Sequence, residues 1–560
     1  MSKAALQTPP KGERSWAYRV PPQLVMLLGA LFVTLTGNHT FFGHLETIYP
    51  WQGNALFICS VGAILWALTS ILLIVLNWFM PVKLALSIVL ITGALCSYFT
   101  DGFGVIFDID MMRNMFATDT SEAADLLNVG LLSHFLLFGV IPLIFFNLLP
   151  LNKQPKLKDI KRRFLMTGFT LVVGTSVIGG NLFAFSGQYA SFFREHKSVR
   201  YYTNPIQPIY SLGALLAQNL PSVASTQFMF QTSRAAIPDT DLHRELVIVV
   251  VGETARADHF SLNGYARETN PMLAKETALI SFSQISSCGT STAVSVPCMF
   301  SILGRDDFVV GDSKTTENVL DIVAKANISV QWRDNNSDSK GVAERVPYVS
   351  YKTSETNPVC DEKRRPKEHF YKECRDEGML DGLQEFVNGQ EQDILIVLHQ
   401  MGSHGPAYSK RYPSAFEKFT PACQTSELSM CSDEEIINAY DNTILYTDYF
   451  LAKVIGFLKR NTPRYETAMI YVSDHGESLG ENKVYLHGLP YMFAPEAQTH
   501  VPIIVWAGAS SDIDIEKTRE LKDLPNSHDA LAQAILLSME VDSDVNITPT
   551  PPLLIMKPDD

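Results

Sequence analysis

Apolar residues are spread very unevenly along this 560-residue chain, and that distribution constrains the fold more than any other feature. Up to about Phe185 the chain consists of long apolar runs with few charges. After about Asp239 it is rich in Asp, Glu, Pro and Asn, as soluble proteins are. A chain of this length is expected to hold two or three units. We therefore predict a membrane-spanning part followed by a soluble domain.

Five stretches of the first part are long and apolar enough to cross a bilayer as helices. The first stretch follows a basic N-terminus and so resembles a signal peptide, but no small-residue cleavage site follows it. We therefore expect an uncleaved helix there and five spans in total. The predicted spans cover residues 23–42, 55–79, 82–100, 128–149 and 164–185.

Basic residues predict the orientation, because loops rich in Lys and Arg stay in the cytoplasm. Both the N-terminus and the loop between the fourth and fifth spans are basic, which puts everything after Phe185 on the other side. Aromatic and basic residues interleave at 192–202, which is typical of a helix on the membrane surface; a solvated linker is the alternative. The predicted divisions are a cytoplasmic N-terminus (1–22), a transmembrane domain (23–186), a surface helix with a linker (187–240) and a soluble domain (241–560).

The cysteines divide in the same way as the apolar residues. Cys59 and Cys96 lie inside apolar runs, where we expect inert core thiols. The other six form three pairs that are close in sequence, which predicts disulfides and an oxidising compartment. Structural zinc is the weaker alternative, because the pairs lack its tight ligand spacing. These six are Cys288, Cys298, Cys360, Cys374, Cys423 and Cys431.

The soluble part alternates strand and helix patterns. Continuous apolar runs, which are typical of strands buried on both faces of a parallel sheet, occur at 246–251, 394–398, 468–472 and 502–506, and a weaker one at 328–332. Helical patterns such as 434–458 lie between them. The pattern predicts an α/β domain with a mainly parallel central sheet. The net charge of −14 argues against a nucleic-acid partner.

Acidic residues and histidines follow the predicted strands. Glu253 follows the first run, and His399 and His404 follow the second. Asp474, His475 and, further on, His487 follow the third. Ligands of α/β sheets bind beyond the carboxyl ends of the strands, and carboxylate with imidazole is a zinc-type ligand set. Each residue alone has an ordinary explanation as a cap, a turn or a loop residue. Their convergence favours a metal site.

A run of small hydroxyl residues offers a nucleophile. The segment 286–298 leads into an apolar helical pattern at 299–303, which resembles the start of a helix. Backbone N–H groups favour an anion at such a site, and a bound metal makes an alkoxide accessible near neutral pH. The residues alone do not distinguish Thr290, Ser291 and Thr292, and an ordinary Ser/Thr cap is the alternative.

These motifs resemble those of the lipid A phosphoethanolamine transferases, a family of the alkaline-phosphatase/sulfatase-like superfamily that includes the mobile colistin-resistance enzymes. The resemblance covers nearly the whole chain. It includes Val-Gly-Glu-Thr-Ala-Arg at 251–256, Cys-Gly-Thr-Ser-Thr at 288–292, Gly-Ser-His-Gly-Pro at 402–406 and Ser-Asp-His-Gly-Glu-Ser-Leu-Gly-Glu at 473–481.

The resemblance implies a role for each matched position. Thr292 matches the nucleophile, and it completes a zinc ligand set with Glu253, Asp474 and His475. His404 and His487 match residues that hold a second zinc or the substrate phosphate and assist catalysis. Lys340 matches a lysine that contacts the substrate and assists catalysis. Asn114, Thr118 and Glu122 match the set that binds the ethanolamine head group, and their spacing of four puts them on one helix face. The implied disulfides are 288–298, 360–374 and 423–431.

The resemblance also implies an activity and a place in the cell. We expect a monomeric, multi-pass protein of the bacterial inner membrane with its catalytic domain in the periplasm. It would use one firmly bound zinc, with a second left open, and move phosphoethanolamine from phosphatidylethanolamine to a lipid A phosphate through a phosphoethanolamine-threonine intermediate. The lower surface charge would weaken binding of polymyxins.

Two alternatives stay open at this point. A related enzyme would transfer to a core sugar or a periplasmic glucan, transfer phosphoglycerol, or hydrolyse esters. A transporter or sensor would not be an enzyme, but the few ionisable residues in the predicted spans disfavour it.

Overall fold

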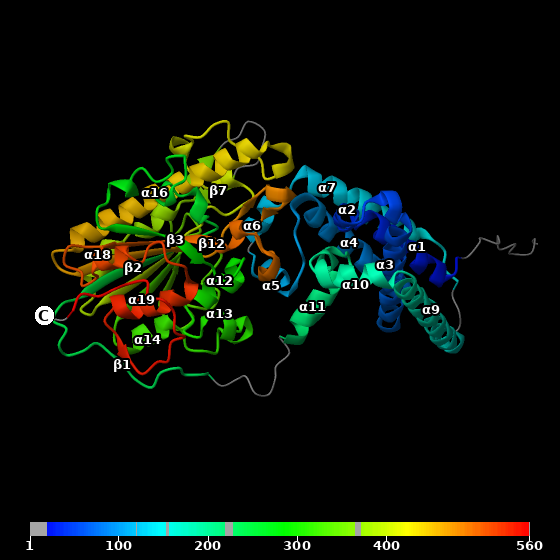
Figure 1. The fold of residues 1–560 in the computed structure, drawn as a ribbon, viewed down its shortest axis with the longest axis horizontal. Helices are drawn as coiled ribbons and strands as arrows, with labels where there is room; N and C mark the ends of the chain where they lie inside the picture. Colours follow the sequence, from blue (N-terminus) through cyan, green and yellow to red (C-terminus); the bar gives the residue numbers. More distant parts are fainter. Residues whose placement is uncertain (1–19, 119, 153–155, 219–227, 364–370, 559–560) are drawn as a thin grey trace, which may run out of the picture. The chain divides into compact units, whose positions relative to one another are not determined.

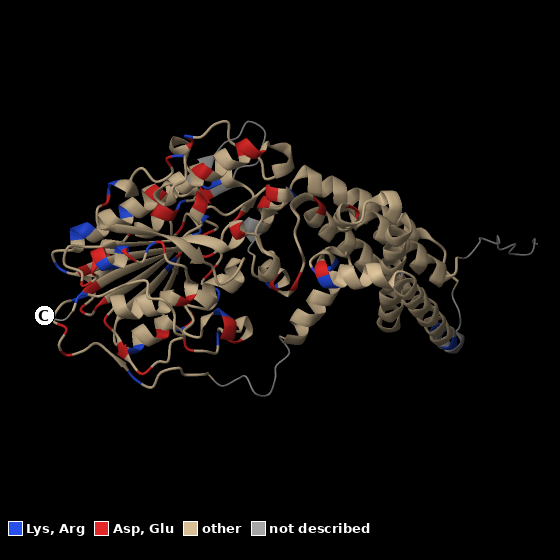
Figure 2. Ribbon diagram, viewed as in Figure 1, with Lys and Arg blue, Asp and Glu red and all other residues tan. Residues whose placement is uncertain are grey.

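The computed structural model describes residues 20–118, 120–152, 156–218, 228–363 and 371–558. The chain forms two compact units. One comprises residues 1–97 and 133–206, and the other comprises residues 98–132 and 207–560. Charged residues are sparse along the helices of the first unit and frequent over the second, as Figure 2 shows. The predicted domain boundaries stay predictions.

The first unit is helical (Figure 1). Four of its described helices are long and apolar enough to cross a membrane, at Trp51–Phe79, Val82–Phe103, Val129–Leu148 and Arg163–Ala184, and the bent pair α1 and α2 makes up to five. The helices are α1 (Pro22–Thr36), α2 (His39–Ile48), α3 (Trp51–Phe79), α4 (Val82–Phe103), α7 (Val129–Phe135), a π-helical turn (Leu136–Val140), α8 (Ile141–Leu148), α9 (Lys156–Ala184), α10 (Ser186–Glu195) and a 3₁₀ turn (Val199–Tyr202). One end of α4 and one end of α7 belong to the second unit, as does α11 (Ile206–Gln218) after its first residue.

The first predicted span is not one continuous helix. It bends by 60° between α1 and α2. The buried Asn38 lies at the bend, where its side-chain amide donates to the carbonyls of Val33 (3.2 Å), Thr34 (3.2 Å) and Asn204 (2.9 Å). An Asn amide that bonds to the backbone competes with the helical hydrogen bonds, which explains the break. The prediction of two buried thiols holds for Cys96 only, because Cys59 is exposed.

An eight-stranded sheet forms the centre of the described part of the second unit. The five predicted strands are all present, and the sheet is mainly parallel as predicted, with β12 antiparallel to both its neighbours. Three short or edge-proximal strands had no clear pattern. The order is β13 (Asn526–Ser527), β3 (Leu279–Ser286), β12 (His500–Ala507), β9 (Glu466–Ser473), β2 (Glu245–Gly252), β8 (Ile394–His399), β4 (Ser329–Asp334) and β5 (Tyr348–Ser350).

Helices cover both faces of this sheet, which explains why β2, β8 and β9 are buried along their whole length (Figure 1). The long α16 (Asp433–Asn461) lies over one face, as the helical pattern at 434–458 predicted, and Ser432 and Glu435 form a capping box at its start. Apolar residues of α14 (Val319–Lys325) and α19 (Leu531–Ser538) join the core on the other face, together with Val247, Val249 and Val251.

Shorter elements and three disulfides complete the described part of this unit. The disulfides join Cys288 to Cys298, Cys360 to Cys374 and Cys423 to Cys431, in the pairs that the resemblance implied. The remaining helices are α5 (Ile109–Ala117), α6 (Thr120–Asp125), α12 (Thr292–Met299), α13 (Gly304–Asp307), α15 (Leu383–Asn388), α17 (Glu496–Thr499) and α18 (Ile515–Arg519). The two-stranded sheets pair β1 (Ala235–Ala236) with β14 (Asp542–Ser543), β6 (Cys360–Lys363) with β7 (Tyr371–Cys374), and β10 (Ser478–Leu479) with β11 (Tyr485–Leu486).

Candidate functional site

Three predicted ligands meet at the carboxyl edge of the sheet. Glu253 follows β2, and Asp474 and His475 follow β9, which is the parallel neighbour of β2. Because parallel strands end at the same edge, residues that are 221 and 222 positions apart come together. All three side chains are buried, and one ligand atom from each lies within 4.8 Å of the others.

Two buried carboxylate oxygens in this group have no hydrogen-bond donor among the described residues. They are Oε1 of Glu253 and Oδ2 of Asp474. Nε2 of His475 lies 3.5 Å from the first and 3.4 Å from the second. Buried polar atoms without partners are costly, and a cation between these three atoms would satisfy them. Two carboxylates and one imidazole also form a donor set that suits zinc.

The other polar atoms of the three ligands are held by hydrogen bonds. Oδ1 of Asp474 accepts from the backbone N–H groups of Thr254 (3.1 Å) and His475 (2.8 Å). Nδ1 of His475 donates to the carbonyl of Gly476 (2.9 Å), so Nε2 carries the lone pair. Oε2 of Glu253 accepts from Nδ2 of Asn336 (2.8 Å). Such outer partners orient metal ligands and fix the histidine tautomer.

Burial shifts the pKa values of all three ligands towards their neutral forms. Burial, with the charge of Asp474 nearby, raises the pKa of Glu253 well above its ordinary value. Burial also raises the pKa of Asp474 to about 7 and lowers that of His475. A bound cation would reverse the preference of the two carboxyl groups by favouring their ionised forms.

Thr292 is the hydroxyl residue that the fold brings to this group. It is the first residue of α12, after Ser291 as the N-cap. Its Oγ1 donates to Oε2 of Glu253 (3.1 Å) and lies 3.4 Å from Nε2 of His475. Thr290 bonds elsewhere, since its Oγ1 donates to the carbonyl of Leu489 (2.7 Å). The hydroxyl run lies at a helix start as predicted, but the helical pattern expected at 299–303 is wrong, because the helix occupies 292–299.

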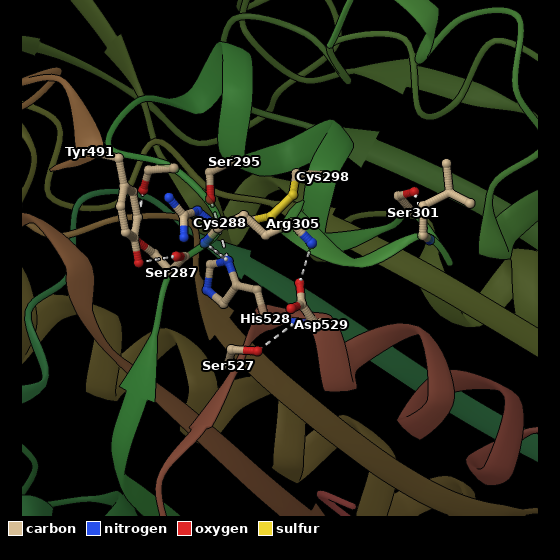
Figure 3. Close-up of a disulfide and its surroundings, with 12 residues drawn as sticks. Ser287, Cys288, Ser295, Cys298, Ser301, Arg305, Tyr491, Ser527, His528 and Asp529 are labelled. Atoms are coloured by element: carbon tan, nitrogen blue, oxygen red, sulfur yellow. Dashed lines mark hydrogen bonds between the residues drawn. A yellow bond between two sulfur atoms is a disulfide. The ribbon is translucent and has the colours of Figure 1, made fainter. Parts of the chain in front are cut away.

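The disulfide between Cys288 and Cys298 fixes the turn that leads into α12, as Figure 3 shows. His528 lies beneath it (Figure 3). Its Nδ1 accepts from the backbone N–H of Cys288 (3.1 Å), and its Nε2 donates to the carbonyl of Ser473 (2.9 Å). Ser295 adds a hydrogen bond from Oγ to the carbonyl of Asp474. The turn that leads to Thr292 and the strand end that leads to Asp474 are thus joined directly.

A cavity of about 150 Å³ opens next to Thr292. Its polar lining includes Asn114, Thr118, Thr292, Lys340, His404 and His487, all of which had predicted roles. Nζ of Lys340 donates to Oγ of Ser337 (2.6 Å) and to the carbonyl of Ala117 (3.2 Å). Burial lowers the pKa of His404, which favours the neutral form of its imidazole.

His487 lies between the two other site histidines. Its ring centre is 4.3 Å from that of His475 and 5.9 Å from that of His404. Its Nδ1 contacts Oε2 of the buried Glu477 at 2.8 Å, an arrangement that orients the imidazole ring.

The predicted helix face with Asn114, Thr118 and Glu122 does not exist. Helix α5 ends at Ala117, and Thr118 adopts an extended backbone while its Oγ1 donates to the carbonyl of Asn114 (2.8 Å). This bond of the Thr118 hydroxyl to a backbone carbonyl competes with the helical hydrogen bonds. Asn114 and Thr118 nevertheless both line the cavity. The side chain of Glu122 lies outside the described residues.

The sequence analysis missed two parts of the site. Asn336 follows β4 closely, so its place after an apolar run was a usable signal. Arg411 gave none: it donates to the carbonyl of His404 (2.7 Å), to Glu373 (2.5 Å) and to Asp125 (2.7 Å), which is 286 positions away. His399 does not join the ligand group as expected, because its Nδ1 pairs with Oδ2 of Asp334 (2.9 Å).

The fold and this site define a sulfatase-like domain that follows a helical membrane region. The Sulfatase family model matches residues 245–540, and the model "Phosphoethanolamine transferase EptA/EptB" matches residues 65–220. The chain is 44% identical to phosphatidylethanolamine transferase Mcr-2 of Escherichia coli, over 94% of this chain and 97% of that protein. It is 35% identical to phosphoethanolamine transferase EptA of E. coli K12, over 86% of each chain.

A solved structure agrees with these relatives over the full length. The integral membrane protein lipooligosaccharide phosphoethanolamine transferase A of Neisseria meningitidis superposes with a TM-score of 0.84 and 32% identity, covering 94% of this chain and 96% of that one. The chain therefore belongs to the EptA/Mcr family of phosphoethanolamine transferases. It is an integral membrane protein with an N-terminal helical membrane region and a C-terminal periplasmic domain, as predicted.

Proposed function

We propose that this enzyme transfers phosphoethanolamine from phosphatidylethanolamine to a phosphate of lipid A, with Thr292 as the nucleophile. The observation that carries the proposal is the position of Thr292. Its hydroxyl contacts Glu253 beside two unpartnered carboxylate oxygens and also lines the cavity. The relatives' names support phosphatidylethanolamine as the donor, since one is a phosphatidylethanolamine transferase. Lipid A appears in the names of more distant relatives that match about half of the chain.

The reaction takes two displacements at phosphorus. Oγ1 of Thr292 attacks the phosphorus of phosphatidylethanolamine and gives up its proton, which its hydrogen bond already directs at Oε2 of Glu253. The bond from phosphorus to the glycerol oxygen breaks, and diacylglycerol leaves after its oxygen takes a proton. A phosphate oxygen of lipid A then attacks the phosphoethanolamine-threonine, and Thr292 leaves and regains its proton.

The cavity residues position the donor for this attack. Lys340 brings a positive charge to the developing charge on the phosphate oxygens. His487, held by Glu477, moves the proton to the departing oxygen and from the attacking one. Asn114 and Thr118 offer oxygen acceptors to the ethanolammonium group. Glu122 would join them as the resemblance implies.

A zinc ion is the cofactor that the donor set fits best, and Glu253, Asp474 and His475 would hold it together with Thr292. When bound, zinc lowers the pKa of a coordinated hydroxyl and offsets negative charge in the transition state. His404 and His487, together with the substrate phosphate, offer further donors for a second zinc. Metal analysis of the purified protein tests this assignment. We expect at least one zinc per chain in the wild type and a loss of it in His475→Ala.

Mass spectrometry of lipid A tests the function. The wild type, Thr292→Ala, Thr292→Ser and Thr290→Ala are expressed at equal levels in a polymyxin-sensitive Gram-negative host. Thr290→Ala is the matched control, because it removes a neighbouring hydroxyl that bonds away from the ligands. We expect a phosphoethanolamine mass increment with the wild type and Thr290→Ala, less of it with Thr292→Ser and none with Thr292→Ala.

Each other outcome changes a different part of the proposal. An undiminished increment with Thr292→Ala would discard Thr292 as the nucleophile while the acceptor stands. No increment with the wild type would make lipid A the wrong acceptor, and core sugars and glucans would be analysed next. Because the modification lowers the negative charge of the surface, polymyxin resistance should follow the increment from variant to variant.

A further inference from the structure

A second group of carboxylates lies at the opposite edge of the central sheet. Glu245 and Glu466 are the first residues of β2 and β9, and the two are directly paired across these parallel strands. Glu540 follows α19 and has a left-handed backbone (φ +51°). The catalytic group lies at the carboxyl ends of the same two strands. The two groups are therefore separated by the full length of β2, which has eight residues.

The three carboxylates surround one small space. One oxygen each of Glu245, Glu466 and Glu540 lies within 4.8 Å of the others, and Glu245 forms a similar group with Asp241 and Asp393. A cavity of about 10 Å³ lies between them and is also lined by Asp512 and Ser511. A space of this size holds about one water molecule or one ion.

The state of Glu245 is a separate observation that points to a ligand. The residue is only 3% exposed, yet neither of its carboxylate oxygens meets a hydrogen-bond donor among the described residues. Neither basic residue before it in the chain bonds to its carboxylate. His243 is largely exposed and contacts Glu466 of the same group at 3.3 Å, while the guanidinium of Arg244 donates to the carbonyls of Gln390 and Gln392.

The pKa values of the three carboxyl groups also indicate that a positive charge belongs in this space. Burial and the carboxylate of Asp393 raise the pKa of Glu245 to about 9, and burial and Asp241 raise that of Glu540 to about 7. Burial also raises the pKa of Glu466. Buried carboxylates this close repel one another unless a proton or a cation lies between them.

We infer that Glu245, Glu466 and Glu540 bind a divalent cation of the Ca²⁺ type, at a site distinct from the catalytic metal centre. All the donors are oxygens, which suits hard cations, and no imidazole or thiolate is part of the group that would favour zinc. The backbone carbonyls and hydroxyls that line the cavity, with water, would complete the coordination. The ion ties the starts of two central strands to the end of α19, so it stabilises the catalytic domain without touching the substrate. This inference does not depend on the proposed function.

Calcium binding to the full-length, zinc-loaded protein in detergent tests the inference. Binding is measured by equilibrium dialysis with radioactive Ca²⁺ at about pH 8. The free Ca²⁺ concentration extends to about 1 mM, which covers the affinity range of extracellular calcium modules. The variants are Glu245→Gln and Glu466→Gln. Glu417→Gln and Glu520→Gln are the matched controls for exposed carboxylates.

We expect saturable binding of one Ca²⁺ in the wild type and in both controls, and its loss in Glu245→Gln and Glu466→Gln. Thermal unfolding is the second readout, and Ca²⁺ should raise its midpoint only in the proteins that bind. Glutamine keeps the size of Glu245 and cannot ionise beside the other carboxylates, so Glu245→Gln without Ca²⁺ should unfold at or above the wild-type midpoint. No saturable binding in the wild type would overturn the inference and leave the cluster held by protons. Unchanged binding in Glu245→Gln would overturn it as well.

Discussion

Arg411 joins three parts of the second unit that lie far apart in sequence. Its guanidinium, with a side chain only 3% exposed, donates to Asp125 of α6, to Glu373 of β7 and to the carbonyl of His404. Residues 98–132 supply Asn114 and Thr118 to the cavity, so Asp125 ties this segment to the loop that carries His404. Arg411→Gln keeps a polar side chain of moderate length and removes the charge.

The expected loss of stability follows from these contacts. Charge-assisted hydrogen bonds contribute about 1.5–3 kcal/mol each, and removal of one partner from a buried ion pair costs about 3–5 kcal/mol. Lys410 still contacts Asp125 at 2.6 Å, which moderates the loss. We therefore expect the free energy of unfolding to fall by about 3 kcal/mol. Lipid A modification should fall as well, because the cavity loses its support.

Urea unfolding of the full-length protein in detergent, followed by tryptophan fluorescence, measures this loss. Arg234→Gln is the matched control, because Arg234 pairs with Asp542 at the surface, with side chains 63% and 54% exposed. An exposed pair contributes at most about 1 kcal/mol. Asp125→Asn and the double variant complete a cycle, in which the double variant should lose less than the sum of the single losses.

The pH dependence of this loss has a definite sign. Burial would raise the pKa of Asp125, but Arg411 and Lys410 hold it below its ordinary value. The carboxylate is then stabilised in the folded state above the unfolded pKa of about 4, and that stabilisation is lost as the pH falls through the lower folded value. The difference in the free energy of unfolding between the wild type and Arg411→Gln should therefore become smaller below about pH 4. If Arg411→Gln costs no more than Arg234→Gln at neutral pH, the network does not support the cavity.

Three more perturbations test other contacts. Asn336→Ala removes the amide that bonds to Oε2 of Glu253 (2.8 Å), and metal affinity, measured by competition with a chelator, should fall about 10- to 100-fold; unchanged affinity would exclude an orienting role. Cys360→Ser with Cys374→Ser opens a loop with a sequence separation of 14, and the free energy of unfolding should fall by about 3 kcal/mol, whereas equal urea midpoints would contradict this. Burial lowers the pKa of His528 to about 3, so the unfolded chain binds the proton first as the pH falls below its ordinary value of about 6.5. Stability should then drop by about 1.4 kcal/mol per pH unit from this group between those values, and His528→Asn should lack that slope; the same slope in both proteins would refute the assignment.

Much of the second unit could be predicted because its strands are buried on both faces. Runs such as 246–251 and 468–472 are apolar throughout, so they stand out from helices and loops. Their parallel pairing then puts Glu253 beside Asp474 and His475, since parallel strands end at the same edge. The edge strands β5 and β13, with three and two residues, are too short to give a pattern.

The errors arose where a side chain overrides the local pattern. Asn38 breaks an apolar run because its amide bonds to three backbone carbonyls, one of them from Asn204. The helix that was expected through Glu122 stops at Ala117, where the hydroxyl of Thr118 bonds to the carbonyl of Asn114. Contacts such as that of Arg411 with Asp125 leave no trace in hydropathy, since neither residue lies in a periodic segment.

The course of residues 98–132 bears on how inhibitors of this enzyme should be sought. A fragment that begins near residue 240 contains every proposed metal ligand but lacks Phe99, Val105, Phe107, Met111 and Asn114, which line the cavity. In a screen against such a fragment, compounds would meet a cavity that lacks this wall. Ligands that owe their affinity to the apolar wall would be passed over, and simple metal chelators would be favoured. The full-length protein is therefore the target on which selective compounds should be selected.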